Sequence, residues 1–138
     1  MIKQFIKEYR FLSNFYISNI EYNGLVFMSA EAAFQAQKCP GIAKSFTRLS
    51  PNKAKARGRS VQLRGDWESV KDDIMYDIVK TKFTQNQDLK QKLLDTGDEE
   101  LIEGNTWNDT YWGMDIRTNR GKNKLGQILM RVREELRG

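Results

Sequence analysis

Apolar and polar residues recur along the chain with periods that predict a mainly helical protein with a small β component. Two short β-prone runs lie at 20–22 and 25–27, and the pair Asn23-Gly24 between them favours the tight turn of a β-hairpin. We therefore expect a hairpin near the start of the chain, followed by helices.

Apolar spacing and capping residues together predict the helices. Ser29 and Ser50 are typical N-cap residues, and Pro51 suits a first helical position. Asp66 starts the clearest amphipathic helix, and Gly97 favours the left-handed conformation that ends a helix. The predicted helices span about residues 30–38, 51–58, 67–82, 87–95 and 124–136.

The stretch 98–122 shows neither period and is the most irregular part of the chain. It is dense in aromatic residues, amides and glycines, a composition that suggests a binding wall. No repeat, low-complexity tract or Pro/Gly-rich linker divides the chain. We predict an α+β fold, mainly helical, in which residues 1–138 form a single compact domain with a small N-terminal β-hairpin and about five helices.

The composition removes several kinds of chemistry. The 138 residues include no His and one Cys, which excludes a Ser-His-Asp or Cys-His pair, a histidine-bound zinc and an internal disulfide. The acidic residues lack the alternate spacing of a calcium loop, and no apolar run approaches the ~18 residues of a membrane span. We expect a cytoplasmic protein without a metal or a membrane partner, whose chemistry uses carboxylates, lysine, amides or hydroxyls.

The net charge of +5 reflects one basic segment. Between Lys38 and Arg64 there are eight Lys and Arg residues and no acidic residue. A solvated face is one interpretation. A phosphate site is another, because the guanidinium groups of Arg57 and Arg59 match phosphate geometry and Gly58 permits close approach of the backbone. Nucleic-acid binding is a third, although aromatic residues that stack on bases are nearly absent there.

Glu31 is the first candidate for chemistry. It lies in the first turn of the predicted 30–38 helix, where the helix dipole favours a carboxylate. The helix is otherwise uncharged except for Lys38, two turns further along a similar face, so we expect it to be buried. A buried carboxylate needs a reason. Glu31 is either an N-terminal charge partner or, with Lys38, part of a polar pocket.

Asp109 is the second candidate, because it lies among Trp107, Tyr111 and Trp112 in the irregular stretch. Aromatic walls there could hold a base or sugar, and the carboxylate could bind ribose hydroxyls or orient water. An exposed turn aspartate is the alternative. Trp67, at the start of its helix, is interpreted as a core anchor or as a stacking residue.

Seven short motifs, taken together, resemble the YbiA-like (NADAR) family over residues 11–136. They are Phe11-Leu12-Ser13-Asn14-Phe15, Glu31 with Phe34-Gln35-Ala36-Gln37-Lys38, Arg57-Gly58-Arg59, the run from Leu63 to Lys71, the run from Leu94 to Asp98, Trp112-Gly113, and the run from Gly121 to Gly126. The resemblance implies a mainly helical α+β domain and a metal-independent N-glycosidase, without a cofactor, that breaks a bond between ribose C1′ and nitrogen. It implies two substrates: ribosylaminopyrimidine phosphates of riboflavin synthesis, or ADP-ribose on guanine, for which nucleic acid would be the carrier.

The motifs also imply roles for residues. Glu31 matches the family glutamate, Lys38 the family lysine, and Asp109 with Trp112-Gly113 the D-x-x-W-G segment. The two carboxylates would stabilise positive charge at C1′ and orient or deprotonate water. Lys38 would hold a phosphate or hydroxyl, or attack C1′ of an opened sugar as an amine. The candidates for substrate binding are Asn14, Phe15, Arg57, Gly58, Arg59, Trp67, Trp112, Gly113 and Asn123.

One position departs from the family pattern: the family usually has histidine after the motif glutamate, and this chain has Ala32. If that histidine only orients the glutamate, turnover is retained, and Asn14 or Tyr16 could serve as the hydrogen-bond partner. If it is an essential acid, the chain is a non-catalytic ADP-ribose or nucleotide-binding module. A nucleic-acid-binding protein that uses the basic segment is the third hypothesis.

Overall fold

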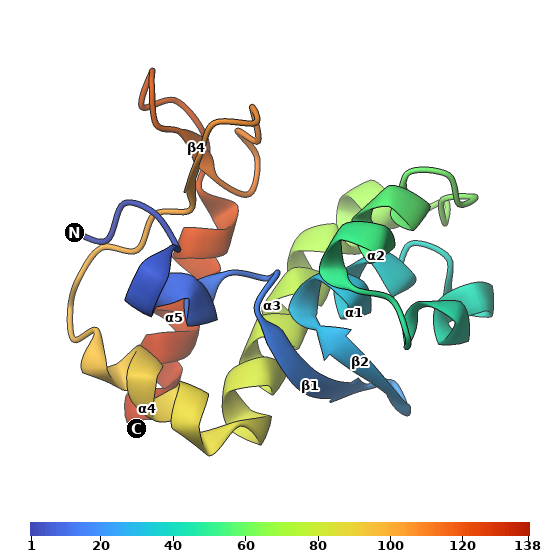
Figure 1. The fold of residues 1–138 in the computed structure, drawn as a ribbon, viewed down its shortest axis with the longest axis horizontal. Helices are drawn as coiled ribbons and strands as arrows, with labels where there is room; N and C mark the ends of the chain where they lie inside the picture. Colours follow the sequence, from blue (N-terminus) through green and yellow to red (C-terminus); the bar gives the residue numbers. More distant parts are fainter. The chain divides into compact units, whose positions relative to one another are not determined.

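The computed structural model describes residues 1–138 and divides into two compact units. Unit 1 consists of Met1–Ser13 and Gln87–Gly138, and unit 2 is the continuous segment Asn14–Asn86. Figure 1 shows the elements of both units along the chain. The mainly helical α+β character predicted from the sequence is confirmed, whereas the expectation of a single domain stays a prediction.

Unit 2 begins with a β-hairpin. β1 (Ile17–Tyr22) pairs antiparallel with β2 (Leu25–Ser29). The predicted turn is confirmed, because Asn23 and Gly24 both have positive φ, 50° and 82°, as a tight hairpin turn requires. The two core residues that pair across the strands and are fully buried are Ile20 and Phe27.

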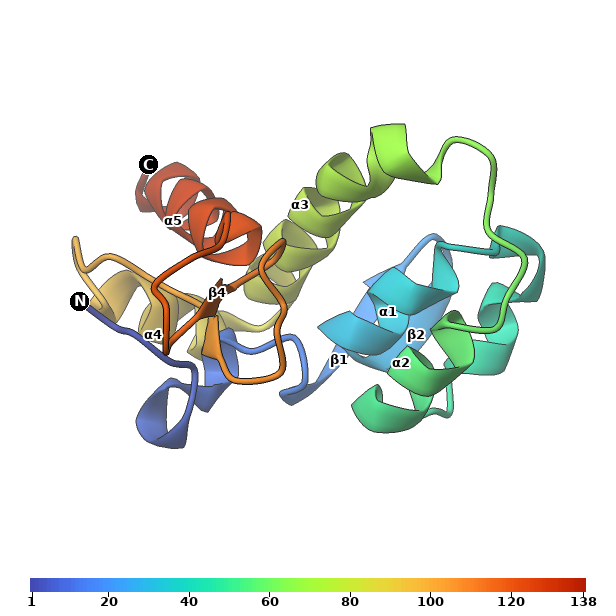
Figure 2. The ribbon, with the colours of Figure 1, turned by 90° about the horizontal axis from the view of Figure 1, so that it is seen from above.

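The next element, α1 (Ala30–Ala36), is buried at every residue. Ser29 caps it as predicted, since the hydroxyl accepts a hydrogen bond from the Ala32 amide (3.1 Å). Small side chains let other elements approach closely, and α1 packs against β2, α2 (Pro51–Gly58) and α3 (Trp67–Gln85). Figures 1 and 2 show α1 among these elements. The predicted helix is thus confirmed, ends two residues early, and occupies the centre of unit 2.

The helices that follow α1 begin largely as predicted. The Ser50 hydroxyl accepts the Lys53 amide at the start of α2 (3.3 Å). A 3-10 helix, η2 (Pro40–Phe46), precedes it and was not predicted. α3 begins after Asp66, but this residue makes no capping bond, because its carboxylate binds Arg64 (2.6 Å) instead. α3 also continues about one turn beyond the predicted end.

α3 contains a buried lysine that the apolar spacing does not reveal. Lys82 is 1% exposed, and its ammonium nitrogen lies 5.7 Å from the ring centre of Tyr16 and 5.2 Å from that of Phe83. Burial lowers the pKa of Lys82 from 10.5 to about 7, because the charged form loses its hydration. The fold therefore favours the neutral amine.

Unit 1 contains η1 (Lys7–Leu12), α4 (Gln87–Asp95) and α5 (Lys124–Arg137). α4 and α5 are confirmed within a residue of their predicted bounds, and Gly97 after α4 has a φ of 63°. α4 and α5 pack against each other. The buried apolar residues of α5 are Leu125, Ile128, Leu129 and Val132.

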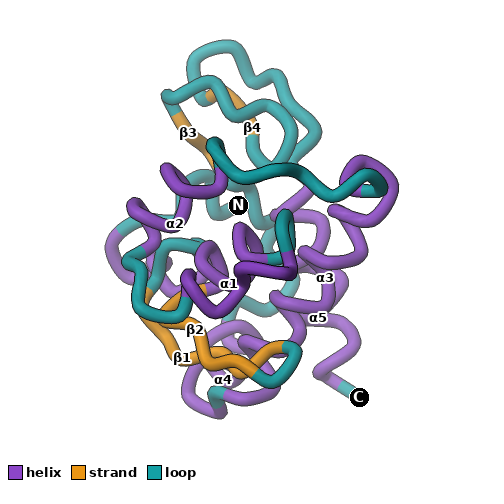
Figure 3. The backbone as a smooth tube through the Cα atoms, turned by 90° about the vertical axis from the view of Figure 1, so that its right-hand side faces the viewer, coloured by secondary structure: helices purple, strands orange, loops and turns teal.

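The irregular stretch between α4 and α5 has little regular structure, as predicted. Its two short strands, β3 (Gly104–Asn105) and β4 (Met114–Asp115), pair in parallel. Figure 3 shows long loops on either side of these strands. Across the whole chain, none of the helices combines the length and the apolar character that spanning a bilayer requires.

We predict that Lys82→Met removes a rise in stability that the wild type shows from about pH 7 to about pH 10. In this range the unfolded chain protonates Lys82 and the folded chain does not. The free energy of unfolding of the wild type therefore increases with pH, by up to about 1.4 kcal/mol per pH unit.

Urea unfolding of both proteins across this range measures the effect, because groups that titrate in both proteins cancel in the difference. A difference between variant and wild type that stays constant with pH would contradict a buried neutral lysine.

Candidate functional site

Glu31 is buried in the first turn of α1. Glu31 is 8% exposed, and its backbone amide donates to the carbonyl of Asn14 (2.9 Å). The first turn of a helix presents backbone N–H groups and the positive end of the dipole, which together favour a carboxylate. The expectation that this helix is buried, with its carboxylate, is confirmed.

Gln35, one turn further along α1, is a hydrogen-bond partner of this carboxylate. Gln35 Nε2 donates to Glu31 Oε2 at 2.6 Å, and both residues are buried. Asn14, considered above for this place, donates its side-chain amide to Met75 Sδ (3.3 Å), and the ring of Tyr16 lies against Lys82. The i,i+4 spacing of Glu and Gln is the sequence signal that could have identified this pair.

Lys38 follows α1 and shares its surroundings with Glu31. The ammonium nitrogen lies 5.9 Å from the ring centre of Trp67, which contacts Phe34 at 5.1 Å between ring centres. Burial lowers the pKa of Lys38, and the negative charge of Glu31 opposes that shift. Lys38 and Glu31 therefore act on each other electrostatically, while Trp67, buried against Phe34, has the contacts of a core anchor.

Three further cations also lower the pKa of Lys38: Arg59, Lys55 and Lys71. With Lys38 they form a group that we call the cationic cluster. Lys55 lies over the ring of Phe15, 5.7 Å from its centre. Lys71 also forms an ion pair with Glu68 (2.9 Å). Like charges that act on one another in this way create a local positive potential, which suits an anionic ligand such as phosphate.

The three residues of the predicted anion motif 57–59 have different surroundings in the structure. Arg57 Nε donates to the Ser45 hydroxyl (3.1 Å), and its guanidinium carbon lies 5.4 Å from the ring centre of Phe46. Gly58 is buried against the side chain of Gln35, so close that a Cβ would lie 2.8 Å from Gln35 Cδ. Arg59 alone of the three belongs to the cationic cluster.

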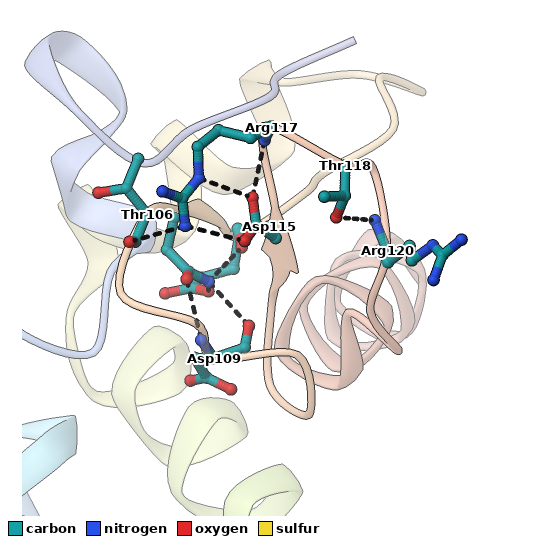
Figure 4. Close-up of polar contacts among 8 residues, drawn as sticks. Thr106, Asp109, Asp115, Arg117, Thr118 and Arg120 are labelled. Atoms are coloured by element: carbon teal, nitrogen blue, oxygen red, sulfur yellow. Dashed lines mark hydrogen bonds and ion pairs between the residues drawn. The ribbon is translucent and has the colours of Figure 1, made fainter.

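In unit 1, Asp109 organises the loop between β3 and β4. Its Oδ1 accepts the backbone amides of Tyr111 (3.1 Å) and Trp112 (2.9 Å), which is the arrangement of an Asx turn. Its own backbone exchanges two hydrogen bonds with the buried carboxamide of Asn105, at 2.9 and 3.0 Å. Figure 4 shows the side chain of Asp109 pointing away from Asp115. These contacts fit the turn-aspartate interpretation, and the catalytic role stays a prediction.

Asn123 and Gly113 hold the same loop to the start of α5. Asn123 Nδ2 donates to the Leu101 carbonyl (2.9 Å), and its Oδ1 accepts the Glu103 amide (2.9 Å). The Asn123 amide donates to the Gly113 carbonyl (3.1 Å). A Cβ at Gly113 would lie 2.7 Å from Asn105 Nδ2. Both residues therefore have structural contacts, and their predicted roles in binding stay predictions.

An ion pair that the sequence analysis missed fixes the far end of this loop. Arg117 donates to the buried carboxylate of Asp115 from its backbone amide (2.8 Å) and from its guanidinium group (3.1 Å). It also donates to the Thr106 carbonyl (3.4 Å), as Figure 4 shows. These hydrogen bonds hold the pKa of Asp115 below its ordinary value. The loop is therefore organised by its own polar groups.

The predicted site residues thus fall into two groups, each described within its own unit. Unit 2 brings together a carboxylate, its amide partner, cations and aromatic rings. Unit 1 holds a second carboxylate in a loop that also carries aromatic residues. The predicted residues in unit 2 are Asn14, Phe15, Glu31, Lys38, Arg57, Gly58, Arg59 and Trp67, and those in unit 1 are Asp109, Trp112, Gly113 and Asn123.

Comparison with known proteins gives one consistent result. The model of the NADAR domain matches residues 2–137. The chain is 39% identical to the N-glycosidase YbiA of Escherichia coli, over 94% of this chain and 82% of that protein. It is also 39% identical to a riboflavin biosynthesis protein of Vibrio vulnificus, over 91% of this chain and 35% of that protein. The NMR structure of E. coli YbiA superposes with a TM-score of 0.85 and 35% identity, covering 99% of this chain and 87% of that one.

We predict that Asp109→Ala lowers the free energy of unfolding by about 1–2 kcal/mol, because two loop amides lose their acceptor. Asp109→Asn keeps an oxygen in the same place, so it lowers stability by less than about 0.5 kcal/mol. Urea unfolding of the two variants makes the comparison. Equal losses in both would contradict the contacts assigned to Oδ1.

Proposed function

The chain belongs to the NADAR domain family and is an N-glycosyl hydrolase, and we propose that its substrate is a ribosylated compound that carries a phosphate. The observation that supports this substrate class is the carboxylate of Glu31 beside the cationic cluster of unit 2. Cleavage at C1′ needs negative charge next to the sugar, and a phosphate needs cations. The two requirements are met by neighbouring groups.

In the proposed reaction, water attacks C1′ as the C1′–N bond breaks. The bonding electrons leave with the nitrogen, which then takes up a proton. Positive charge develops at C1′ during departure, and the carboxylate of Glu31 stabilises it while orienting or deprotonating the water. Because Glu31 is buried, its charge is poorly screened by solvent and acts strongly on the sugar.

The cationic cluster is proposed to hold the phosphate. Arg59 offers a planar fork of donors, and Lys38 and Lys55 offer compact charges. Phosphate would lessen the repulsion among these cations, which binding of a neutral sugar would not do. We assign Lys38 to this electrostatic role. In the alternative, its amine attacks C1′ of an opened sugar, and borohydride would trap the resulting Schiff base.

Asp109 is proposed as a second carboxylate that acts on the substrate. Its Oδ1 is occupied by two backbone amides, and its Oδ2 accepts no hydrogen bond. Asp109→Asn retains the acceptor that holds the turn but removes the charge. A loss of turnover in this variant, with the fold intact, therefore reports on the charge alone.

Two substrates fit the proposal. The name of the Vibrio vulnificus relative supports an intermediate of riboflavin biosynthesis, for which we propose a ribosylaminopyrimidine phosphate. ADP-ribose attached to guanine has the same kind of bond and also carries phosphate, with nucleic acid as its carrier. Parallel incubation with both compounds, read by mass spectrometry of the released sugar, distinguishes them.

We predict that Glu31→Gln lowers the release of sugar by about 100-fold or more, because the carboxylate charge is removed while the shape is kept. The wild type is assayed with and without a chelator, and circular dichroism confirms that the variant is folded. Turnover that survives in Glu31→Gln would remove the assignment of Glu31. Saturable binding without any product from the wild type would instead indicate a binding module, consistent with Ala32.

We predict that Arg59→Ala and Lys55→Ala each raise KM by about 10-fold, because each removes a charged partner of the phosphate. Lys53→Ala is the matched control, since it removes the same charge from the same segment outside the cluster. Steady-state kinetics on the substrate identified above measures all three. A KM that rises equally in Lys53→Ala would show that net charge, and not the cluster, attracts the substrate.

A further inference from the structure

The side chain of Gln35 combines a strong hydrogen bond with an unsatisfied group. Its Nε2 donates to Glu31 Oε2 at 2.6 Å, whereas its Oε1 is buried and has no hydrogen-bond partner. The residue is 6% exposed. A buried acceptor without a donor costs free energy, whereas the hydrogen bond from Nε2 to the buried carboxylate stabilises the fold. The carboxamide is therefore retained for its donor to Glu31, at the cost of one unsatisfied oxygen.

Gly58 explains how the carboxamide is held. Gly58 is the last residue of α2. It lies against the end of the Gln35 side chain, with no room for a Cβ between the two residues. Gln35 Oε1 is the atom closest to that missing Cβ. An ionised carboxylate only accepts hydrogen bonds, so Nε2 faces Glu31 and Oε1 is left against the glycine. The amide is confined between a carboxylate on one side and a backbone on the other.

We propose that Gln35 is a positioning residue for Glu31, held in place by Gly58. The proposal rests on the catalytic role proposed for Glu31. An amide donor stabilises the ionised carboxylate and cannot accept its proton, so it keeps Glu31 in the form that acts on water and on C1′. It also fixes the plane of the carboxylate, and small errors in such geometry reduce turnover strongly.

The first test is Gln35→Met, which keeps the length of the side chain and removes the donor. We expect kcat to fall by about 10- to 100-fold with KM changed by less than about 2-fold. The acidic limb of the kcat profile moves to higher pH, because the ionised form has lost a donor. Loss of the donor to the buried carboxylate lowers the melting temperature, and loss of the unsatisfied oxygen offsets part of this fall, so kcat is compared at a temperature at which both proteins are folded.

The matched control is Gln37→Met in the same segment. Gln37 is also buried, but its Nε2 donates to the Ala33 carbonyl (3.1 Å), away from the carboxylate. This variant is expected to lose stability while its pH profile matches that of the wild type. A pH profile that moves equally in both variants, or kcat that is unchanged in Gln35→Met, would overturn the proposal.

Two further variants examine the geometry. Gly58→Ala removes no polar group but displaces the carboxamide, so it should lower kcat in the same way as Gln35→Met. Gln35→Glu can donate to Glu31 only while the two carboxyl groups share a proton, so its activity should recover at acid pH. Wild-type activity in Gly58→Ala, or no recovery in Gln35→Glu, would contradict the proposed arrangement.

A measurement without substrate separates this proposal from the proposed function. In 13C NMR spectra, the carboxyl carbon of Glu31 should titrate at a higher pH in Gln35→Met than in the wild type. If the wild type releases no sugar but this difference is present, the proposed function fails and the Gln35–Glu31 interaction stands. If the wild type is active and the difference is absent, the positioning role fails alone.

Discussion

The hydrogen bond between Gln35 and Glu31 lies inside a helix in which every residue is buried. A carboxylate in such a place is tolerated only with donors nearby, of which the Gln35 carboxamide is one. The neighbouring elements of unit 2 pack around this hydrogen bond. Alanine side chains let α2 and α3 approach α1, and Gly58 at the end of α2 leaves room for the carboxamide. The position of the Glu31 carboxylate therefore depends on how closely the neighbouring helices pack against α1.

The carboxylate in unit 1 is held by a different principle. Asp109 is fixed by backbone amides of its own loop, and the buried Asn105 and the Asp115–Arg117 pair support that loop from within. Regular structure there is limited to two strands of two residues each. Local polar contacts thus stabilise this loop, whereas apolar packing stabilises the surroundings of α1. Substitutions in this loop should affect loop order more than the core.

Local signals were sufficient for most of the fold. The Asn23-Gly24 turn, the Ser29 cap and the amphipathic period of α3 act over a few residues and are readable in the sequence. The 3-10 helices were missed because they carry no such period. Lys82 was missed because a single buried lysine does not disturb the apolar pattern around it. The low charge of α1 predicted correctly that this helix is buried.

The site was predictable in its residues but not in its contacts. Motif resemblance selected Arg57 and Arg59 together, yet only the structure shows that Arg57 donates to Ser45 while Arg59 belongs to the cationic cluster. Glu31 and this cluster are proposed to act on one ribosylated phosphate. A crystal structure of the Glu31→Gln variant with the bound substrate tests this proposal most directly. We predict a phosphate in contact with Arg59 and a ribose C1′ next to residue 31. A substrate bound with C1′ away from that residue would contradict the proposed function.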